Sequence, residues 1–292
     1  MQSMTSSGAS ATTEQQGRVP LFSADAAAPD GLTPAEQERY QRDGWLGVYP
    51  LLTPEGVSYT CQVRERVVRG FMAPEWLARS RDAKDLELRP WFKSMHAYVP
   101  TFYDITCHPA IVNRMVSILG PDVIAWGATL LRAPVGTTHR WHVDVEHRHW
   151  DGVSVFLGLE NIEPRSTLKV ISGSQRMPEP PQAYGIIHDD AQALTAVRAQ
   201  VPESEIVPVP VRPGEFFIFA GRMWHGSHNS ATLPRIAMII HYSRPDAHIR
   251  VPTNWDAPIN WHPARPPCVL VAGEDRAGVN RLVERPAGGR QA

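Results

Sequence analysis

The segment around residue 142 combines two side-chain types that bind divalent metal ions. It reads HRWHVDVE over residues 139–146. If this segment forms a strand, His142 and Asp144 lie two residues apart and project from the same face. An imidazole and a carboxylate on one face can occupy two neighbouring coordination positions of a metal ion. A third ligand must then come from another part of the chain.

His225 is the best candidate for that third ligand, because it follows a strongly apolar segment, residues 215–220. Two histidines and one carboxylate on one side of a metal ion form the facial triad of non-haem Fe(II) oxygenases, which leaves the opposite positions open. A structural zinc site would instead close all four positions. Cys61, Cys107 and Cys268 are too scattered for a thiolate site. A lone His-x-Asp pair also occurs by chance, and its histidine is then a packing or surface residue.

Arg235 offers the cation that a 2-oxo acid co-substrate requires. A guanidinium can hold the distal carboxylate of such a molecule with two parallel hydrogen bonds. Arg235 lies ten residues after His225, at the start of the apolar segment 235–243. A hairpin between the two residues would bring the guanidinium near the metal pocket. The joint presence of His142, Asp144, His225 and Arg235 is far more specific than any one of them.

The elements that must position these residues form a β-rich region. Short segments rich in β-branched and aromatic residues follow one another after residue 122, and Gly or Pro turns separate them. This pattern predicts a sheet sandwich or barrel. The expected strands are residues 123–132, 152–159, 166–171, 205–211, 215–220 and 235–243.

Helices are expected before the β-rich region, because Pro at a first helical position follows an N-cap residue there. These helices are residues 34–43, 54–71 and 109–119, and a short strand is expected at residues 45–49. Residues 178–203 interrupt the strands as a long, partly helical insertion. Such an insertion is either a lid over the pocket or a surface decoration.

Length and charge limit the class of protein. The chain has 292 residues, and we expect a disordered tail at 1–30, a single domain at 31–285 and a flexible tail at 286–292. The formal net charge of -1 disfavours a nucleic-acid binder, which would normally be basic. No apolar run approaches the roughly 20 residues of a membrane span, and no signal peptide is readable. We therefore expect a cytoplasmic protein without a nucleic-acid or membrane partner.

Over about residues 32–245 the chain resembles the phytanoyl-CoA dioxygenase family of Fe(II)/2-oxoglutarate oxygenases. The resemblance implies an all-β core with flanking helices, built as a double-stranded β-helix or jelly roll. It also implies that His142, Asp144 and His225 are iron ligands and that Arg235 binds the 2-oxoglutarate carboxylate. One departure is Gln175, where many members have His. The motifs that carry the likeness are residues 32–36, 42–45, 118–121, 141–144, 157–161, 170–174, 212–215 and 225–227, with Asn229 and Arg235.

The resemblance implies an enzyme that uses Fe(II), 2-oxoglutarate and O₂ on a small molecule. Related halogenases have a small residue at the position of Asp144, so the carboxylate favours hydroxylation or another oxygen-dependent oxidation of a C–H bond. Oxidative cyclisation, epimerisation and desaturation use the same residues and stay open. So does a non-enzyme alternative, a β-sandwich binding module that contains a metal. Composition and the habits of the family favour bacterial specialised (natural-product) metabolism, such as antibiotic biosynthesis.

Three further residues are candidates for the co-substrate site. Arg132 either contacts the oxo acid or another anion, or is a solvated residue at a strand end. Ser227 and Asn229 are expected to support the oxo-acid site through hydrogen bonds.

Glu146, Tyr98 and Phe102 are candidates for substrate contact. Glu146 shares the face of Asp144 by alternation along a strand. Tyr98 and Phe102 belong to an aromatic-rich stretch that either covers the pocket mouth or packs helix against sheet. Trp141 and Trp224 each precede an expected ligand and should point to the opposite strand face as packing residues.

Overall fold

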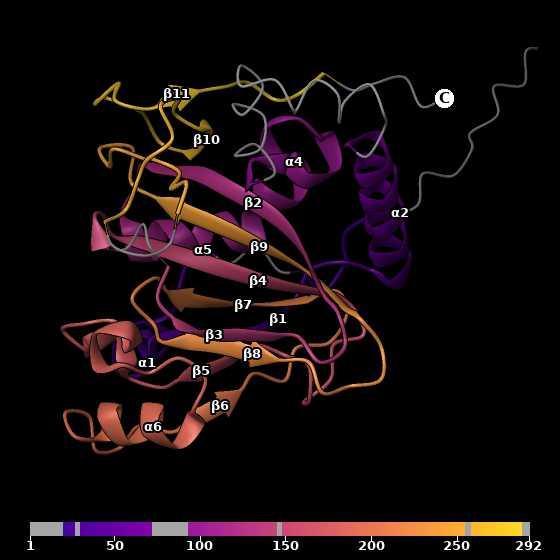
Figure 1. Cartoon of the computed structure of the whole chain (residues 1–292). Helices are drawn as coiled ribbons and strands as arrows, with labels where there is room; N and C mark the ends of the chain where they lie inside the picture. The colour runs from indigo at the N-terminus through magenta and orange to yellow at the C-terminus, as the bar shows by residue number, and fades with distance from the viewer. Residues whose placement is uncertain (1–19, 27–29, 72–92, 145–147, 255–257, 288–292) are drawn as a thin grey trace, which may run out of the picture.

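The computed structural model describes residues 20–26, 30–71, 93–144, 148–254 and 258–287. Two β-sheets face each other within these residues, and helices cover the larger one (Figure 1). The larger sheet has the strand order β1-β7-β4-β9-β2-β10-β11, and the smaller sheet has the order β3-β8-β5-β6. This arrangement is a double-stranded β-helix, as the family resemblance implies.

Strands from both ends of the chain meet in the larger sheet. Its neighbours pair antiparallel, except for the short parallel pair β10–β11. Its strands are β1 (Trp45–Pro50), β2 (Val123–Ala133), β4 (Gly152–Glu160), β7 (Glu215–Ala220), β9 (Arg235–Ser243), β10 (Pro267–Ala272) and β11 (Arg281–Leu282).

The smaller sheet is made of short strands that follow turns or loops. Its pairs are all antiparallel, and β8 lies between β3 and β5. The strands are β3 (Thr138–His142), β5 (Lys169–Ile171), β6 (Ile206–Pro208) and β8 (His225–His228).

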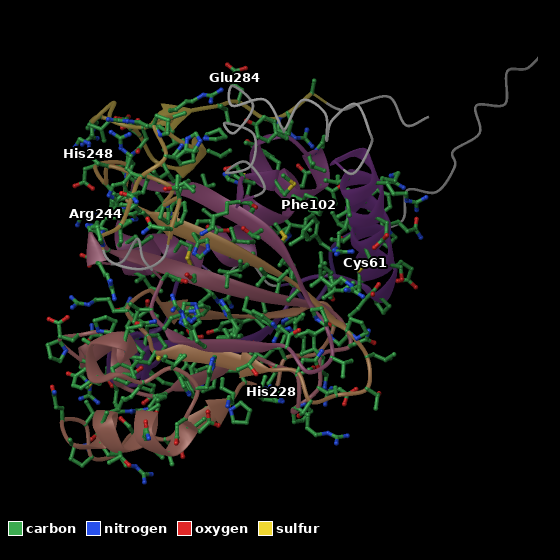
Figure 2. All side chains as sticks on the ribbon, viewed as in Figure 1. Cys61, Phe102, His228, Arg244, His248 and Glu284 are labelled. Atoms are coloured by element: carbon green, nitrogen blue, oxygen red, sulfur yellow. The ribbon has the colours of Figure 1, made fainter. Side chains whose placement is uncertain are left out.

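Three helices cover the outer face of the larger sheet: α2 (Pro54–Phe71), α4 (Pro100–Thr106) and α5 (Pro109–Leu119). Cys61 of α2 and Phe102 of α4, both labelled in Figure 2, are buried with Val155 and Ile240 of the sheet in one hydrophobic cluster. Burial of such side chains contributes about 1.5–3 kcal/mol each.

A second cluster fills the space between the two sheets. Phe156 and Ala237 of the larger sheet belong to it together with Val170 of the smaller sheet, and both Phe217 and Phe219 are fully buried. Ser154 pairs with His241 and Phe156 pairs with Ile239, so these residues share the inward face of the larger sheet. The polar residues Ser154 and His241 thus lie in the same inner layer as the apolar cluster, toward the end of the sheet where β4 begins.

The insertion at residues 178–203 packs on the outer face of the smaller sheet. It contains the 3₁₀ turn η6 (Pro181–Tyr184) and helix α6 (Asp190–Arg198), and a further turn, η5 (Ser174–Arg176), precedes it. Ala193 and Val197 of α6 are buried against Trp141 and Trp224. Both tryptophans thus point away from the inner layer, as expected from their position beside the predicted ligands.

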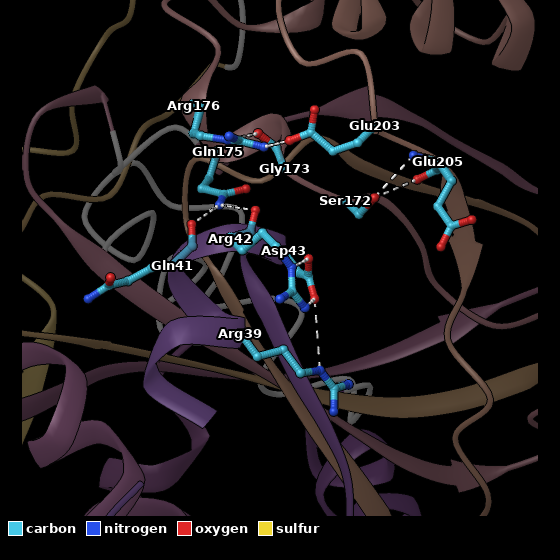
Figure 3. A network of polar contacts seen from close by, with 10 residues as sticks. All are labelled: Arg39, Gln41, Arg42, Asp43, Ser172, Gly173, Gln175, Arg176, Glu203 and Glu205. Atoms are coloured by element: carbon cyan, nitrogen blue, oxygen red, sulfur yellow. Dashed lines mark hydrogen bonds and ion pairs between the residues drawn. The ribbon is translucent and has the colours of Figure 1, made fainter. Parts of the chain in front are cut away.

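Helix α1 (Pro34–Asp43) shows how closely local sequence rules are followed. Thr33 and Glu36 form a capping box, and Gly44 ends the helix in the left-handed conformation with φ 78°. Gln175, the departure from the family pattern, donates from Nε2 to the carbonyl of Gln41 over 2.9 Å (Figure 3). The side chain therefore satisfies a free carbonyl at the end of the helix and joins α1 to the turn after β5.

The structure corrects several expected boundaries. Residues 20–26 belong to the folded part, because Ser23 donates to Leu51 and the Phe22 ring lies 4.1 Å from the ring of His108. The strands expected at 166–171 and 205–211 are shorter, because only Lys169–Ile171 and Ile206–Pro208 form strands. Strands β10 and β11 were not expected, because the region after Pro245 is rich in Pro and reads as irregular.

The buried side chain of His96 makes stability depend on pH. His96 lies in the 3₁₀ turn η3 (Met95–Ala97), where its Nε2 atom is 3.1 Å from the carbonyl oxygen of Ala125. Burial lowers the pKa of His96 to about 4, below its usual value of 6.5. The unfolded chain therefore binds a proton at this position between pH 6.5 and 4, while the folded protein does not.

We expect the free energy of unfolding to fall by about 2–3 kcal/mol through this one group as the pH drops from 7 to 4.5. The variant His96→Gln keeps a donor but does not titrate, so it should lose that much less stability over the same range. Urea unfolding at both pH values measures the difference. Identical pH dependence in the two proteins would contradict this role of His96.

Candidate metal centre

Strand pairing brings together two histidines that lie far apart in the sequence. His142 at the end of β3 is the register partner of His225 at the start of β8. Their imidazole rings lie 4.1 Å apart, centroid to centroid. The pairing requires an extra residue in β3, because the register shifts between His139 and His142. This bulge turns His142 inward while Trp141 stays on the outer face.

Both imidazoles are oriented by backbone carbonyls. The Nδ1 atom of His142 is 2.8 Å from the carbonyl oxygen of Arg140, and the Nδ1 atom of His225 is 2.9 Å from that of Met223. Each Nδ1 therefore donates its proton to a carbonyl, so that Nε2 carries the lone pair that can bind a metal. Burial, with the nearby His225, lowers the pKa of His142 to about 3, so this imidazole is neutral and able to bind a metal at neutral pH.

Asp144 completes the cluster from the loop after β3. The sequence analysis placed it on the same strand as His142, but the strand ends at His142. The Oδ1 atom of Asp144 lies 4.0 Å from Nε2 of His142 and 3.6 Å from Nε2 of His225. One ligand atom from each of the three residues lies within 4.8 Å of the others. Two nitrogens and one carboxylate oxygen thus face a common point.

The second oxygen of Asp144 is held by residues that the sequence analysis missed. Ser154 donates a hydrogen bond of 2.9 Å to Oδ2 of Asp144, and its hydroxyl also lies 3.0 Å from Nδ1 of His241. His241 stacks on Trp126 with ring centroids 4.7 Å apart. Gly127 makes room for this ring, because a Cβ there would lie 2.9 Å from Cδ2 of His241.

A pattern in the sequence could have identified these two residues. Ser154 and His241 are polar positions inside otherwise apolar strands, and both fall on the inward face by alternation. A buried polar group needs a partner, so such positions point to a polar cluster between the sheets.

Arg235 is also buried, with 4% of its surface exposed, at the start of β9. Its Nη1 atom donates to the carbonyl of Ser166, and its guanidinium lies 5.6 Å from the ring of Phe156. Burial lowers the pKa of Arg235 to about 10, yet the group stays charged at neutral pH. Its buried Nε has no hydrogen-bond partner among the described residues.

Arg235 lies close to the histidine cluster. Burial is the main reason that the pKa of His139 falls to about 4, and the charges of His142 and Arg235 lower it further. The ring of His139 lies 4.3 Å from that of His142. A cation with a free donor is therefore present beside the three-residue cluster.

The connection between His225 and Arg235 is not the hairpin that the sequence suggested. Strand β8 belongs to the smaller sheet and β9 to the larger one, so the chain crosses between the sheets. Asn229 holds this crossing, because its Nδ2 donates to the carbonyls of Ala133 and Leu233. Its Oδ1 accepts from the amide of Ala231. The side-chain hydrogen bonds of Asn229 therefore stabilise the loop that leads into β9 and Arg235.

The other expected site residues lie in different places. Ser227 is buried two residues beyond His225 on the same face of β8. Arg132 is exposed and pairs with Ile236, which puts its side chain on the sheet face opposite to Arg235. Phe102 is fully buried in the cluster beneath α4, whereas Tyr98 is 48% exposed. Glu146 lies outside the described residues. The structure does not bring Arg132 or Phe102 to the metal ligands.

The donor set suits a divalent transition metal such as Fe(II). Two imidazole nitrogens and one carboxylate oxygen on one side match the facial arrangement that leaves positions open for other ligands. The orphaned donor on Arg235 suits the carboxylate of a bound organic acid. The residues present therefore fit both a metal ion and a 2-oxo acid.

The family model of phytanoyl-CoA dioxygenase (PhyH) matches residues 40–237. The match covers more than half of the chain, so the chain belongs to this family. It is thus an enzyme, an Fe(II)- and 2-oxoglutarate-dependent oxygenase. Family membership decides against the alternative of a binding module.

Solved structures of low sequence identity share the fold. EctD from S. alaskensis with bound Fe has a TM-score of 0.59 at 18% identity, covering 87% of this chain and 88% of that chain. The non-heme monooxygenase ThoJ, as a Ni complex, has a TM-score of 0.58 at 20% identity, covering 86% and 89%. CytC3 with Fe(II) and alpha-ketoglutarate has a TM-score of 0.57 at 18% identity, covering 87% and 94%. No curated protein matches this chain.

The helices of the described residues can also be compared with the length and hydropathy of a membrane span. In the part of the chain that the structure describes, no helix is both long and apolar enough to cross a membrane.

The hydrogen bond from Ser154 should strengthen metal binding. Loss of a group that orients a ligand usually costs 10- to 100-fold in metal affinity, so we expect Ser154→Ala to weaken Fe(II) binding by about tenfold. Anaerobic calorimetric titration with Fe(II) measures this. Ser243→Ala is the matched control, because that hydroxyl donates to the carbonyl of Asp151 instead. Equal affinity in wild type and Ser154→Ala would contradict the assignment.

Proposed function

We propose that His142, Asp144 and His225 hold Fe(II), and that the enzyme hydroxylates a small molecule in bacterial specialised metabolism. The observation that carries the metal assignment is the one-sided cluster of three ligand atoms within 4.8 Å of one another. When bound, iron together with 2-oxoglutarate and O₂ supplies the oxidising power, while the protein positions the reactants.

In this proposal the chain's own residues have distinct tasks. The carbonyls of Arg140 and Met223 fix which imidazole nitrogen meets the metal. Ser154 keeps one oxygen of Asp144 occupied, so that Oδ1 faces the metal. Arg235 binds the distal carboxylate of 2-oxoglutarate with its buried Nε, which has no partner among the described residues, and with the adjoining guanidinium nitrogens.

Hydroxylation is favoured by the carboxylate at position 144. With a metal bound, Asp144 would fill the position that a halide needs for halogenation, and Ser154 holds its side chain in place. Bacterial metabolism is supported by composition: Arg greatly outnumbers Lys, which occurs only at positions 84, 93 and 169. Cyclisation, epimerisation and desaturation would use the same residues. Mass spectrometry separates them from hydroxylation, because only the hydroxylated product gains an oxygen atom from O₂.

Arg235→Gln should weaken binding of 2-oxoglutarate by about 2–5 kcal/mol, because a buried charged partner is lost. The measurement is anaerobic titration of the Fe(II)-loaded protein with 2-oxoglutarate, followed by the visible absorption band of the chelate. Fe(II) affinity without 2-oxoglutarate should stay unchanged.

Arg132→Gln is the matched control, since Arg132 lies at the same end of the sheet, on the neighbouring strand β2, with its side chain on the opposite face. It should bind 2-oxoglutarate as the wild type does. If Arg132→Gln lost binding while Arg235→Gln kept it, the assignment of the co-substrate carboxylate to Arg235 would be wrong.

A further inference from the structure

A cavity of about 690 Å³ lies at the end of the larger sheet where β4 begins and β9 ends. Ser243, on its wall, is the register partner of Gly152. Figure 2 shows two other lining residues, Arg244 and His248, near each other on this side of the molecule. The volume is in the range that holds a small organic molecule.

The cavity lies one two-residue strand step from residues that support the metal centre. The Gly152–Ser243 pair is followed two residues further along both strands by the Ser154–His241 pair, a step of about 7 Å. Ser154 in turn donates to Asp144. The cavity residue Arg222 lies three positions before His225. The end of the sheet that carries the cavity therefore lies next to the residues that support Asp144, and Ser243 shares the inward face of β9 with His241.

Aromatic rings form one wall of the cavity. Trp150 and Trp261 lie 6.4 Å apart with their planes inclined by 41°, and the ring of His149 meets Trp261 edge-on at 5.0 Å. Trp126 packs edge-on against Trp150 at 6.2 Å. Trp126 also stacks on His241, whose Nδ1 lies beside the Ser154 hydroxyl that donates to Asp144. The aromatic wall is therefore continuous with the residues that hold Asp144. Such a wall suits a flat, apolar ligand body.

The charges around this wall are mostly positive. Arg148, Arg222, Arg244 and Arg250 line the cavity, against Asp151 and Asp246 as the acidic lining residues.

Within the described part of the chain, Asp246 is the ion-pair partner of Arg244. The other three arginines have no ion-pair partner there. Arg222 and Arg250 each make only one long hydrogen bond, of 3.5 Å, to a carbonyl. These guanidinium groups remain available for a carboxylate or phosphate, which they bind with paired hydrogen bonds.

Resting on the proposed function, we propose that this cavity is the substrate site and that the substrate is an anion. It carries a carboxylate or phosphate group, which Arg148, Arg222 and Arg250 bind, on a flat, apolar body that lies against Trp150 and Trp261. The anionic group anchors the molecule at the cavity mouth, so that a C–H bond of the body is directed toward the metal ligands.

The test uses metal-free, full-length protein, so that it does not depend on Fe(II) or 2-oxoglutarate. Calorimetric titrations compare cinnamate and phenyl phosphate with the neutral cinnamamide. We expect at least one anion to bind, about tenfold or more tighter than the amide, and its affinity to fall with added salt. The two anions distinguish a carboxylate site from a phosphate site.

Variants then locate the binding. The triple variant Arg148→Gln, Arg222→Gln and Arg250→Gln should lower the affinity for the anion by about tenfold or more. The control Arg212→Gln changes an exposed arginine before β7, at the opposite end of the sheet, and should leave the affinity unchanged. Circular dichroism checks that the triple variant is folded.

Three results would overturn the proposal: no binding of either anion at millimolar concentration, equal binding of the amide, or an unchanged affinity in the folded triple variant. Anion binding that depends on the three arginines, in a protein that never consumes 2-oxoglutarate, would support the cavity as an anion site and contradict the proposed function instead. The two failures are thus distinguishable.

Discussion

The register between β3 and β8 is the constraint on which the rest of the structure depends. It sets His142 opposite His225, and the bulge in β3 turns His142 inward while Trp141 packs outward. A slip by one residue would exchange these faces. The imidazole would then point toward helix α6, and the indole would point into the inner layer. The metal-ligand histidines on the inner face and the packing of Trp141 on the outer face therefore both require the same register.

The inner end of the fold buries several polar groups and satisfies them through neighbouring strands. Asp144 and His225 are nearly inaccessible to water, as are Ser154 and His241. Burying such groups without partners would cost several kcal/mol. Carbonyls, the Ser154 hydroxyl and the stacked ring of Trp126 hold them instead, so the metal ligands are oriented before any metal binds. Arg235 departs from this pattern, since its buried Nε has no partner in the described structure, and that gap fits a bound carboxylate.

Much of this arrangement could be predicted from the sequence, for physical reasons. The start and end of α1 follow from Thr33, Glu36 and Gly44, whose local chemistry needs no tertiary contact. Richness in β-branched and aromatic residues between Gly or Pro turns identified β7 and β9 with their full bounds.

What escaped prediction depended on contacts between distant segments. The end of β3 before Asp144 and the crossing of the chain between the sheets after β8 are set by tertiary pairing. Arg132 resembles Arg235 in type and position, and the opposite faces of their side chains follow only from the register of β2 with β9. Ser154 and His241 were missed because the role of each rests on a contact with another strand or loop: Ser154 bonds Asp144 from the loop after β3, and His241 contacts Ser154 across the β4–β9 pair.

The central claim is that His142, Asp144 and His225 form one Fe(II) site beside Arg235. The most direct test is a crystal structure grown anaerobically with Fe(II) and 2-oxoglutarate, with anomalous diffraction recorded at the iron edge. The account predicts one strong anomalous peak about 2 Å from Nε2 of both histidines and from Oδ1 of Asp144, with 2-oxoglutarate reaching Arg235. An iron peak bound elsewhere, or none at these three residues, would contradict it.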